Sequence, residues 1–402
     1  MYIFPSLINM APAATSSLPT APHDLTGHIS QDIFPDGLKT TGQHPPLYDH
    51  IIPFERFPKH ITGPTVWKAE DYRENPEKWT HVFTQDQIDE LSSASDAFLA
   101  SKTPLTGISK TNFKLPNLAA YLHKLRADLI DGKGFILFKG FPVEKWGNHK
   151  SAVAYMGLGT YLGYFVSQNS RGHVLGHVKD LGEDSTQIDK VRIYRTNARQ
   201  YFHADDSDIV GLLCIAKALE GGESDLVSSH HVYNTLATEH PEVLKTLTEP
   251  IWYFDRKGET SKGQDEYIRT SVVYLEPGGK GRVGPILRPL PRPLQRRGNY
   301  PPLSDAQQEA LRVLEETCVR LSLHMILDIG DIQFLSNAHV LHARTAYTDH
   351  APPAPRRHLM RLWLATPENE GGWKLPFWDS NEKKRGGIQV DDQAPVALLD
   401  AE

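Results

Sequence analysis

The sequence predicts a mainly β protein, a distorted jelly roll with helices packed against its outside. Strand patterns dominate from Val210 onward, with helical patterns inserted between them. The two patterns do not alternate regularly enough for a doubly wound sheet, and the chain has no internal repeat. A jelly roll accommodates many such strands in two packed sheets.

Composition limits the classes of protein that remain. The 402 residues, 39% hydrophobic and 23% charged, suit a soluble globular protein with a sizeable core. A net charge of -6 and a pI near 6.3 argue against nucleic acid or an anionic membrane as partner. No stretch approaches the roughly 18 apolar residues of a transmembrane helix. We therefore expect a small-molecule partner, with a homo-oligomer as one option for assembly.

The ends of the chain and its cysteines indicate organisation and location. Residues 1–45 are rich in Pro, Ser, Thr and Ala without a period, and we expect an irregular N-terminal extension. Residues 46–402 are predicted to form a single domain with helical insertions and a C-terminal tail. The first 24 residues lack the basic region of a secretory signal. Cys214 and Cys318 form no disulfide framework, so a reducing, cytoplasmic location is expected.

Helical periodicity dominates the first half of the domain. It predicts three helices, over 84–100 with a cap at Thr84, over 115–129, and over 151–163. A short buried strand is predicted between the last two, over Phe135–Phe138. The stretch 164–180 is predicted as a loop or short strands.

Strand patterns dominate the second half. They predict strands over 210–218, 225–228, 270–275, 332–335 and 357–365. Two helices are inserted, one over 232–247 with a break near Pro241, and one over 304–326 capped by Ser304 or Asp305. The proline- and arginine-rich stretch 286–302 is predicted to be a loop.

The most informative stretch is Gln200–Asp208, which contains a His-x-Asp pair. In an extended strand, His203 and Asp205 share a face and can point at one ion, whereas a helix would splay them apart. An imidazole and a carboxylate are two thirds of the facial triad of non-heme Fe(II) oxygenases, which needs one more histidine. His342 is the best later candidate, and its rival His339 is expected to face the other way.

The ordered set of motifs resembles the taurine dioxygenase and TfdA-like family of Fe(II)- and 2-oxoglutarate-dependent dioxygenases. The resemblance runs from about Leu115 to Ala365. It is sharpest at Tyr201–Asp205, Gly221–Ser224, Asn337–Tyr347 and Arg356–Leu364. It implies a double-stranded β-helix, the jelly roll of these enzymes, with Fe(II), 2-oxoglutarate and O2 as cofactor and co-substrates.

The resemblance also assigns roles to residues. His203, Asp205 and His342 match the metal ligands, and these three are the predicted catalytic set. Ser224 matches a residue that bonds the far carboxylate of 2-oxoglutarate, and Arg357 the arginine that clamps it. Arg361 matches a second arginine nearer the metal and substrate, with Arg356 left open as an alternative clamp.

The chemistry of a 2-oxo acid explains the pair Arg357 and Arg361 independently of the resemblance. A 2-oxo acid that fills two open metal positions leaves a third for O2, and its distal carboxylate then needs a fixed cation. A guanidinium gives a two-pronged, charge-assisted match. Arg357 and Arg361 are four residues apart, so on a strand they share a face with Cα atoms about 13 Å apart.

Other polar residues are weaker candidates. Substrate contacts are predicted for Gln168, Asn169, Asn197, Arg199 and Arg361. In a separate group, His230 and His231 are expected to cap a helix, while Asp206 and Asp208 are expected to be structural or near the substrate.

The predicted function is oxidation of an unactivated C–H bond in a small anionic or zwitterionic substrate, such as an amino acid, sulfonate or carboxylate. Hydroxylation is the expected outcome. Oxidative cyclisation or desaturation at the same iron site is an alternative, as are a cupin-type oxygenase without a co-substrate and a non-catalytic sensor of 2-oxoglutarate and metal.

Overall fold

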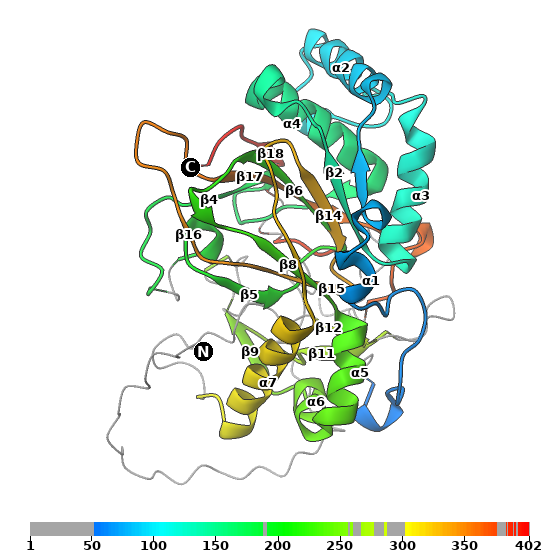
Figure 1. The fold of residues 1–402 in the computed structure, drawn as a ribbon, viewed down its shortest axis with the longest axis vertical. Coiled ribbons are helices and arrows are strands. Elements are labelled where there is room, and N and C mark those ends of the chain that lie inside the picture. Colours follow the sequence, from blue (N-terminus) through cyan, green and yellow to red (C-terminus); the bar gives the residue numbers. More distant parts are fainter. Residues whose placement is uncertain are drawn as a thin grey trace.

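Two β-sheets face each other at the centre of the protein, and helices cover their outer surfaces (Figure 1). A computed structural model describes residues 52–187, 191–255, 258–259, 267–276, 285–287, 302–375, 383, 385–388, 390 and 393–401. The expected N-terminal extension, residues 1–45, lies outside this part of the chain. The predicted mainly β jelly roll with flanking helices is confirmed.

In the part of the chain that the structure describes, the larger sheet has eight strands. Seven of them follow the order β1 (Thr80–Val82), β2 (Phe135–Lys139), β14 (Ile332–Ser336), β6 (Ile209–Ala216), β17 (His358–Ala365), β4 (His173–Lys179) and β18 (Val396–Ala397). The eighth, β3 (Tyr164–Phe165), pairs with the end of β17. The pairing of β14 with β6 and of β6 with β17 is antiparallel, as a jelly roll requires.

Within the described residues, the smaller sheet has four strands. Its order is β13 (Leu323–Met325), β8 (Ser224–Ser228), β15 (Val340–Arg344) and β5 (Gln200–His203). Three two-stranded ribbons lie beside the sheets: β7 (Glu220–Gly221) with β16 (Tyr347–Thr348), β9 (Trp252–Asp255) with β10 (Tyr267–Thr270), and β11 (Val273–Leu275) with β12 (Pro285–Leu287).

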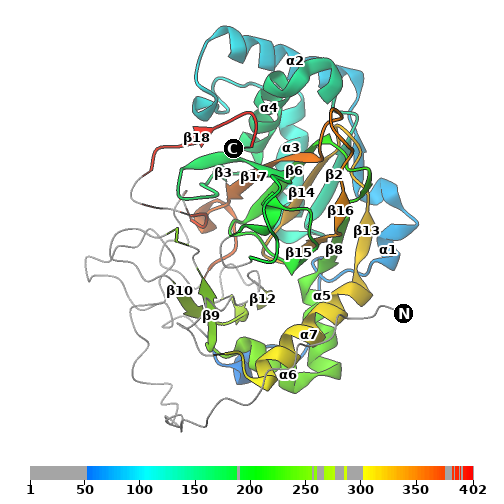
Figure 2. The same cartoon turned by 90° about the vertical axis from the view of Figure 1, so that its left-hand side faces the viewer.

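The helices form two groups on opposite sides of the sheets (Figure 2). Against the larger sheet lie α2 (Gln85–Ala100), α3 (Leu118–Asp131) and α4 (Val143–Leu162). Against the smaller sheet lie α5 (Ser229–Glu239), α6 (Pro241–Thr248) and α7 (Asp305–Leu321), and the short α1 (Glu70–Arg73) contacts β13. No helix among the described residues is long and apolar enough to cross a bilayer.

Apolar side chains form three layers: one between the larger sheet and its helices, one between the two sheets, and one between the smaller sheet and its helices. Alternation along the strands separates these layers. On β17, Met360 and Leu362 pack outward against the helices, whereas Leu359 and Trp363 point between the sheets. The same alternation on β6 places Leu212 between the sheets. Odd-numbered positions of β17 therefore face the interior, and Arg361 is among them.

Local signals fixed the helix starts that were predicted from sequence. Thr84 and Ser304 each accept a hydrogen bond from the backbone of the residue three positions on, completing capping boxes at α2 and α7. The predicted break near Pro241 is also confirmed, since α5 ends at Glu239 and α6 begins at the proline.

Other boundaries differ from the predictions. The helix predicted over 304–326 ends at Leu321, because Leu323–Met325 instead pairs with β8 as β13. The helix predicted from Ser151 begins at Val143 and contains a non-helical residue, Gly147, with φ 70°. A strand edge and a glycine, neither visible in the apolar period, account for these two errors.

Smaller differences affect the remaining strands. The strand predicted over 270–275 is divided between β10 and β11, and the last strand begins at His358 rather than Arg357. The stretch 164–180 contains β3 and β4, in agreement with the short strands expected there. Of the loop predicted over 286–302, β12 takes the first two residues, and 288–301 lie outside the described chain.

A histidine pair links the core to the C-terminal tail. His177 on β4 and His358 on β17 are both buried, and their Nδ1 and Nε2 atoms lie 2.8 Å apart. His177 Nε2 donates to the carbonyl of Leu398 at 3.0 Å, so its Nδ1 accepts from His358. Burial lowers the pKa of His177 and, with the neighbouring ring, lowers the pKa of His358 to about 4.

The histidine pair predicts an acid-sensitive loss of stability. Between about pH 6.5 and pH 4 the unfolded histidines take up protons that the folded pair resists, so the free energy of unfolding falls as pH decreases, by on the order of 2 kcal/mol. Above about pH 6.5, the histidine pair makes its full contribution to the free energy of unfolding. Urea unfolding of His358→Gln at several pH values should show a shallower decline than wild type. The exposed His149→Gln is the control and should follow wild type; equal slopes for all three proteins would contradict the prediction.

Candidate active site

Two neighbouring strands of the smaller sheet bring the predicted histidines together. His342 on β15 lies directly opposite His203 at the end of β5, with ring centroids 4.1 Å apart. Asp205 follows two residues after His203, just beyond the strand. All three side chains are buried, and one ligand atom from each lies within 4.8 Å of the others.

The donor set suits a divalent transition metal. His203 Nε2 and His342 Nε2 lie 3.7 and 4.0 Å from the two carboxylate oxygens of Asp205. Two imidazoles and one carboxylate on one side of a site are the ligands of non-heme Fe(II) oxygenases, with the opposite side left for substrates. The residues therefore fit iron, which the prediction placed here.

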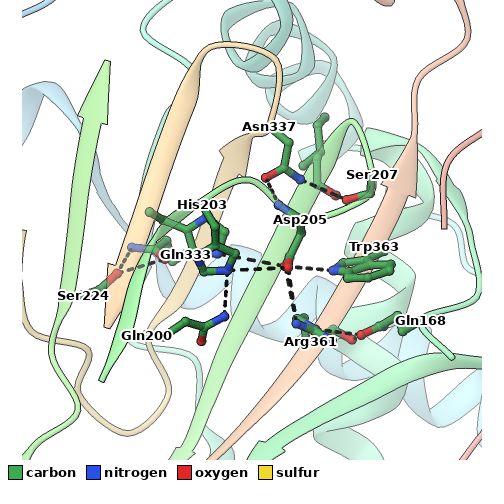
Figure 3. Close-up of polar contacts among 12 residues, drawn as sticks. Gln168, Gln200, His203, Asp205, Ser207, Ser224, Gln333, Asn337, Arg361 and Trp363 are labelled. Atoms are coloured by element: carbon green, nitrogen blue, oxygen red, sulfur yellow. Dashed lines mark hydrogen bonds and ion pairs between the residues drawn. The ribbon is translucent and has the colours of Figure 1, made fainter. Parts of the chain in front are cut away.

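Hydrogen bonds fix the carboxylate in place (Figure 3). Trp363 Nε1 donates to Asp205 Oδ2 at 2.8 Å. The backbone N–H of Asp205 donates to Asn337 Oδ1 at 3.0 Å, and Asn337 Nδ2 donates to Ser207 Oγ at 3.0 Å. Asn337 thus fixes the backbone of Asp205 and the side chain of Ser207, as outer partners of metal ligands commonly do.

The charges around Asp205 keep it ionised. Burial alone would raise the pKa of this carboxyl, but Arg361 and the imidazoles of His342 and His203 outweigh burial and lower it. Arg361 Nη1 lies 3.5 Å from both carboxylate oxygens. A carboxylate ligand is therefore available at neutral pH.

The imidazoles are held neutral, as metal ligands must be. Burial lowers the pKa of His203 and lowers that of His342 to about 3. His203 Nδ1 donates to the carbonyl of Tyr201 at 2.8 Å, which leaves the Nε2 lone pair facing the cluster. The amide of Gln200 donates to this Nε2 at 2.8 Å, in the place where a metal would bond.

Arg361 is held in place by Gln168, Tyr194 and Trp363. Its Nε donates to Gln168 Oε1 at 2.8 Å, while Gln168 Nε2 donates to the carbonyl of Arg361 at 2.9 Å. Its guanidinium carbon lies 4.8 and 4.7 Å from the ring centroids of Tyr194 and Trp363. Gly176 makes this possible, because a Cβ there would lie 2.1 Å from Gln168 Oε1.

Arg357 and Ser224 lie at the polar end of the interior, beyond the histidines. Arg357 is buried and its Nη2 donates to the carbonyl of Gly222 at 2.8 Å. Ser224 is buried beside Gln333, whose Nε2 donates to its Oγ at 3.2 Å. Arg356 is exposed and donates to the carbonyl of Asp180 at 2.9 Å. Of the two adjacent arginines, Arg357 is therefore the one placed to meet a buried ligand.

Of the remaining residues predicted to contact the substrate, one lies beside the cluster and three do not. Gln168 lies beside the cluster through Arg361. Asn169 instead accepts backbone N–H bonds within its own turn, and Asn197 is exposed and accepts from Tyr347 through its backbone carbonyl. Arg199 pairs with Glu315 of α7 at 2.7 Å. The structure does not bring these three side chains to the cluster.

The neighbouring histidines have structural partners. His339 Nε2 lies 3.2 and 3.1 Å from the carbonyls of Leu129 and Ile130 at the end of α3, turned away from the cluster as expected. His230 contacts Thr65 Oγ1 at 2.7 Å. The predicted capping role is wrong, because Ser228 caps α5 by accepting from the backbone of His231.

The C-terminal tail closes the loop that follows Asp205. Arg385 is fully buried and forms an ion pair with Asp208, whose Oδ2 also accepts from the backbone of Thr366 at 2.7 Å. The backbone N–H of Gly387 donates to the carbonyl of Asp206 at 2.6 Å. Asp208 is thus structural, and Arg385 and Gly387 of the C-terminal tail pack against the loop that follows Asp205.

Several residues beside the cluster were not predicted from the sequence. Gln200 and Trp363 are each close in sequence to a predicted residue, three before His203 and two after Arg361, and strand alternation could have flagged Trp363. Gln333 and the clamp role of Asn337 depend on partners far away in the chain, so no local signal reveals them.

Comparison with known proteins places the chain in a family. The family described as "Taurine catabolism dioxygenase TauD, TfdA family" matches residues 101–363. The chain belongs to this family. The predictions of a 2-oxoglutarate-dependent non-heme iron dioxygenase and of its double-stranded β-helix are confirmed.

One relative is similar to the chain in sequence, and two solved structures are similar to it in fold. The taurine hydroxylase-like protein SAT17 of Stachybotrys chartarum is 30% identical over 321 residues, which cover 77% of this chain and 80% of that protein. An asparagine oxygenase solved with Fe(II), 2S,3S-3-hydroxyasparagine and succinate shares the fold with TM-score 0.54 at 15% identity, over 72% of this chain and 94% of its own. The oxygenase OrfP, solved with Fe, succinate and (3S)-hydroxy-L-Arg, gives TM-score 0.51 at 13% identity, over 71% and 94%.

The ligand assignment can be tested by metal binding alone. Anaerobic calorimetry with Fe(II) should show one tight site in wild type. His342→Ala should weaken it by more than the 10–100-fold that loss of an outer-shell partner costs. His339→Gln is the matched control, because its ring faces α3 and its loss should lower stability without removing the metal site. Retained binding in His342→Ala together with lost binding in His339→Gln would overturn the assignment.

Proposed function

We propose that this dioxygenase hydroxylates an unactivated C–H bond of a small amino-acid-like substrate. The observation that carries the proposal is the buried set of two neutral imidazoles and one ionised carboxylate, fixed in position between the two sheets. His203, Asp205 and His342 would hold Fe(II). Iron and 2-oxoglutarate, when bound, supply an oxidant from O2, with succinate and CO2 as co-products.

Two further side chains of the protein are proposed to bind the co-substrate. Arg357 and Ser224 would bind the distal carboxylate of 2-oxoglutarate, because both are buried at the same end of the interior as the ligands. Ser224 lies opposite Arg344, two residues beyond His342, which is about 7 Å along the strand. That separation is comparable to the length of a five-carbon dicarboxylate that binds metal through its keto-acid end.

Arg361 is proposed to meet the substrate. Among the described residues its Nη2 has no hydrogen-bonding partner, while its Nε and Nη1 are engaged by Gln168 and Asp205. A guanidinium that is fixed in this way presents one free edge to an anion next to the metal ligands. A carboxylate of an amino acid suits that edge. The structures of the asparagine oxygenase and of OrfP, which hold hydroxylated amino acids, support the same substrate class.

We also propose a cytoplasmic location for the protein. The two cysteines, Cys214 and Cys318, are buried free thiols, and burial raises the pKa of Cys214 to about 12. Inert reduced thiols suit a cytoplasmic protein. A homo-oligomer is retained as a prediction that sedimentation analysis would test.

A substrate screen tests the function. Purified protein with Fe(II), 2-oxoglutarate and ascorbate is incubated with panels of amino acids, sulfonates and carboxylates, and succinate is measured. Substrate-dependent succinate should appear with an amino acid, and incubation under labelled O2 should place one labelled oxygen in the product. A dehydrogenated or cyclised product without label would overturn hydroxylation, and turnover only with sulfonates would overturn the substrate class.

The co-substrate site gives a separate prediction. Arg357→Gln should raise the concentration of 2-oxoglutarate needed for half-maximal rate by tens- to thousands-fold, since losing a buried charge-assisted pair costs about 2–5 kcal/mol. Ser224→Ala should cost less, about 1–2 kcal/mol. Arg356→Gln, at the exposed neighbour, should match wild type. If Arg356→Gln shows the large effect and Arg357→Gln does not, the clamp has been assigned to the wrong arginine.

A further inference from the structure

A second buried arginine lies beside the proposed clamp. Arg344 is the last residue of β15, two positions after His342, so its side chain points between the sheets as that of His342 does. In the pairing of β15 with β8 it lies opposite Ser224. Arg344 and Arg357 are each only 6% exposed.

The hydrogen bonds of these two arginines are incomplete. Arg344 Nη2 donates to the carbonyls of Thr196, at 3.1 Å, and Ala198. No described residue provides an acceptor for its buried Nε and Nη1, or for the buried Nη1 of Arg357. Buried guanidinium nitrogens that lack an acceptor are costly, which points to a ligand that supplies one.

The positive charges of Arg344 and Arg357 also lack a neutralising partner among the described residues. Within the described chain, no carboxylate lies at ion-pair distance from either guanidinium. The ring of Tyr347 stands near both, with its centroid 4.9 Å from the guanidinium carbon of Arg344 and 5.1 Å from that of Arg357. A guanidinium is not deprotonated in proteins, so both side chains are cations at neutral pH. Two like charges buried together require an anion.

We infer that Arg344 and Arg357 form one anion site, and that Arg344 is a further residue that binds the distal carboxylate of the 2-oxo acid. A carboxylate has two oxygens and can accept from both guanidinium groups at once. The three nitrogens without partners and the hydroxyl of Ser224 line the same end of the interior. This inference rests on the proposed function, because it adds a residue to the co-substrate site.

A purely structural role for Arg344 makes a different prediction. Its contacts with the carbonyls of Thr196 and Ala198 fasten the segment before β5, and this alone would make substitutions destabilising. Such a role would weaken all ligands equally. A carboxylate-binding role affects only ligands that carry the distal carboxylate.

The experiment therefore compares two 2-oxo acids of equal chain length. Protein loaded with Mn(II) is titrated by calorimetry, without O2, with 2-oxoglutarate and with 2-oxopentanoate, which lacks the distal carboxylate. Arg344→Gln should weaken 2-oxoglutarate by about 10–100-fold, in line with the loss of a charged hydrogen bond, and leave 2-oxopentanoate unchanged. Arg356→Gln is the control and should leave both unchanged. An equal loss for both acids, or no loss, would overturn the inference.

A second variant keeps the inference testable if Arg344→Gln fails to fold. In Arg357→Gln, Arg344 still provides one cation, so 2-oxoglutarate should still bind at least about 10-fold more tightly than 2-oxopentanoate. Complete loss of that preference in Arg357→Gln would show that Arg344 contributes nothing, while the proposed function stands. If wild type itself shows no preference between the two acids, the proposed distal-carboxylate site fails and the inference fails with it.

Discussion

The carboxylate of Asp205 is the group on which the site depends. It is buried, it is ionised, and it is approached by a guanidinium, an indole N–H and two imidazoles. A buried charge is tolerated only when its neighbours are fixed. Arg361 and Trp363 come from the larger sheet and His342 from the smaller one, so this single group requires the two sheets to be in register with each other.

The jelly roll meets this requirement through strand alternation. Each strand sends one face to a helical layer and the other to the space between the sheets, where Leu212 and Leu359 form an apolar floor. The polar residues His203, Ser224 and Arg344 gather toward one end of β5, β8 and β15. The fold therefore combines an apolar base with a cluster of buried charged side chains, where the low dielectric strengthens each electrostatic contact.

Local chemistry explains why much of this could be predicted. The His-x-Asp pair spans three residues at the end of β5, His342 lies within β15, and Arg357 directly precedes β17. The capping boxes at Thr84 and Ser304 lie within single turns. What could not be predicted depends on partners far along the chain. The end of α7 at Leu321 is decided by the pairing of β13 with β8.

The same limit applies within the site. Asn337 acts on Asp205 from 132 residues away, and the significance of Arg344 emerges only when β15 is placed beside β8 and near Arg357. Arg199 was predicted to contact the substrate, but it precedes β5 and pairs with Glu315 of α7.

The most direct test of the account is a crystal structure of the protein grown without O2 in the presence of Fe(II) and 2-oxoglutarate, with iron located by its anomalous scattering. The account predicts one iron bound by His203, Asp205 and His342, with the keto-acid end of 2-oxoglutarate on the metal and its distal carboxylate on Arg357. Iron at any other set of ligands, or a distal carboxylate that points away from the buried arginines, would contradict it.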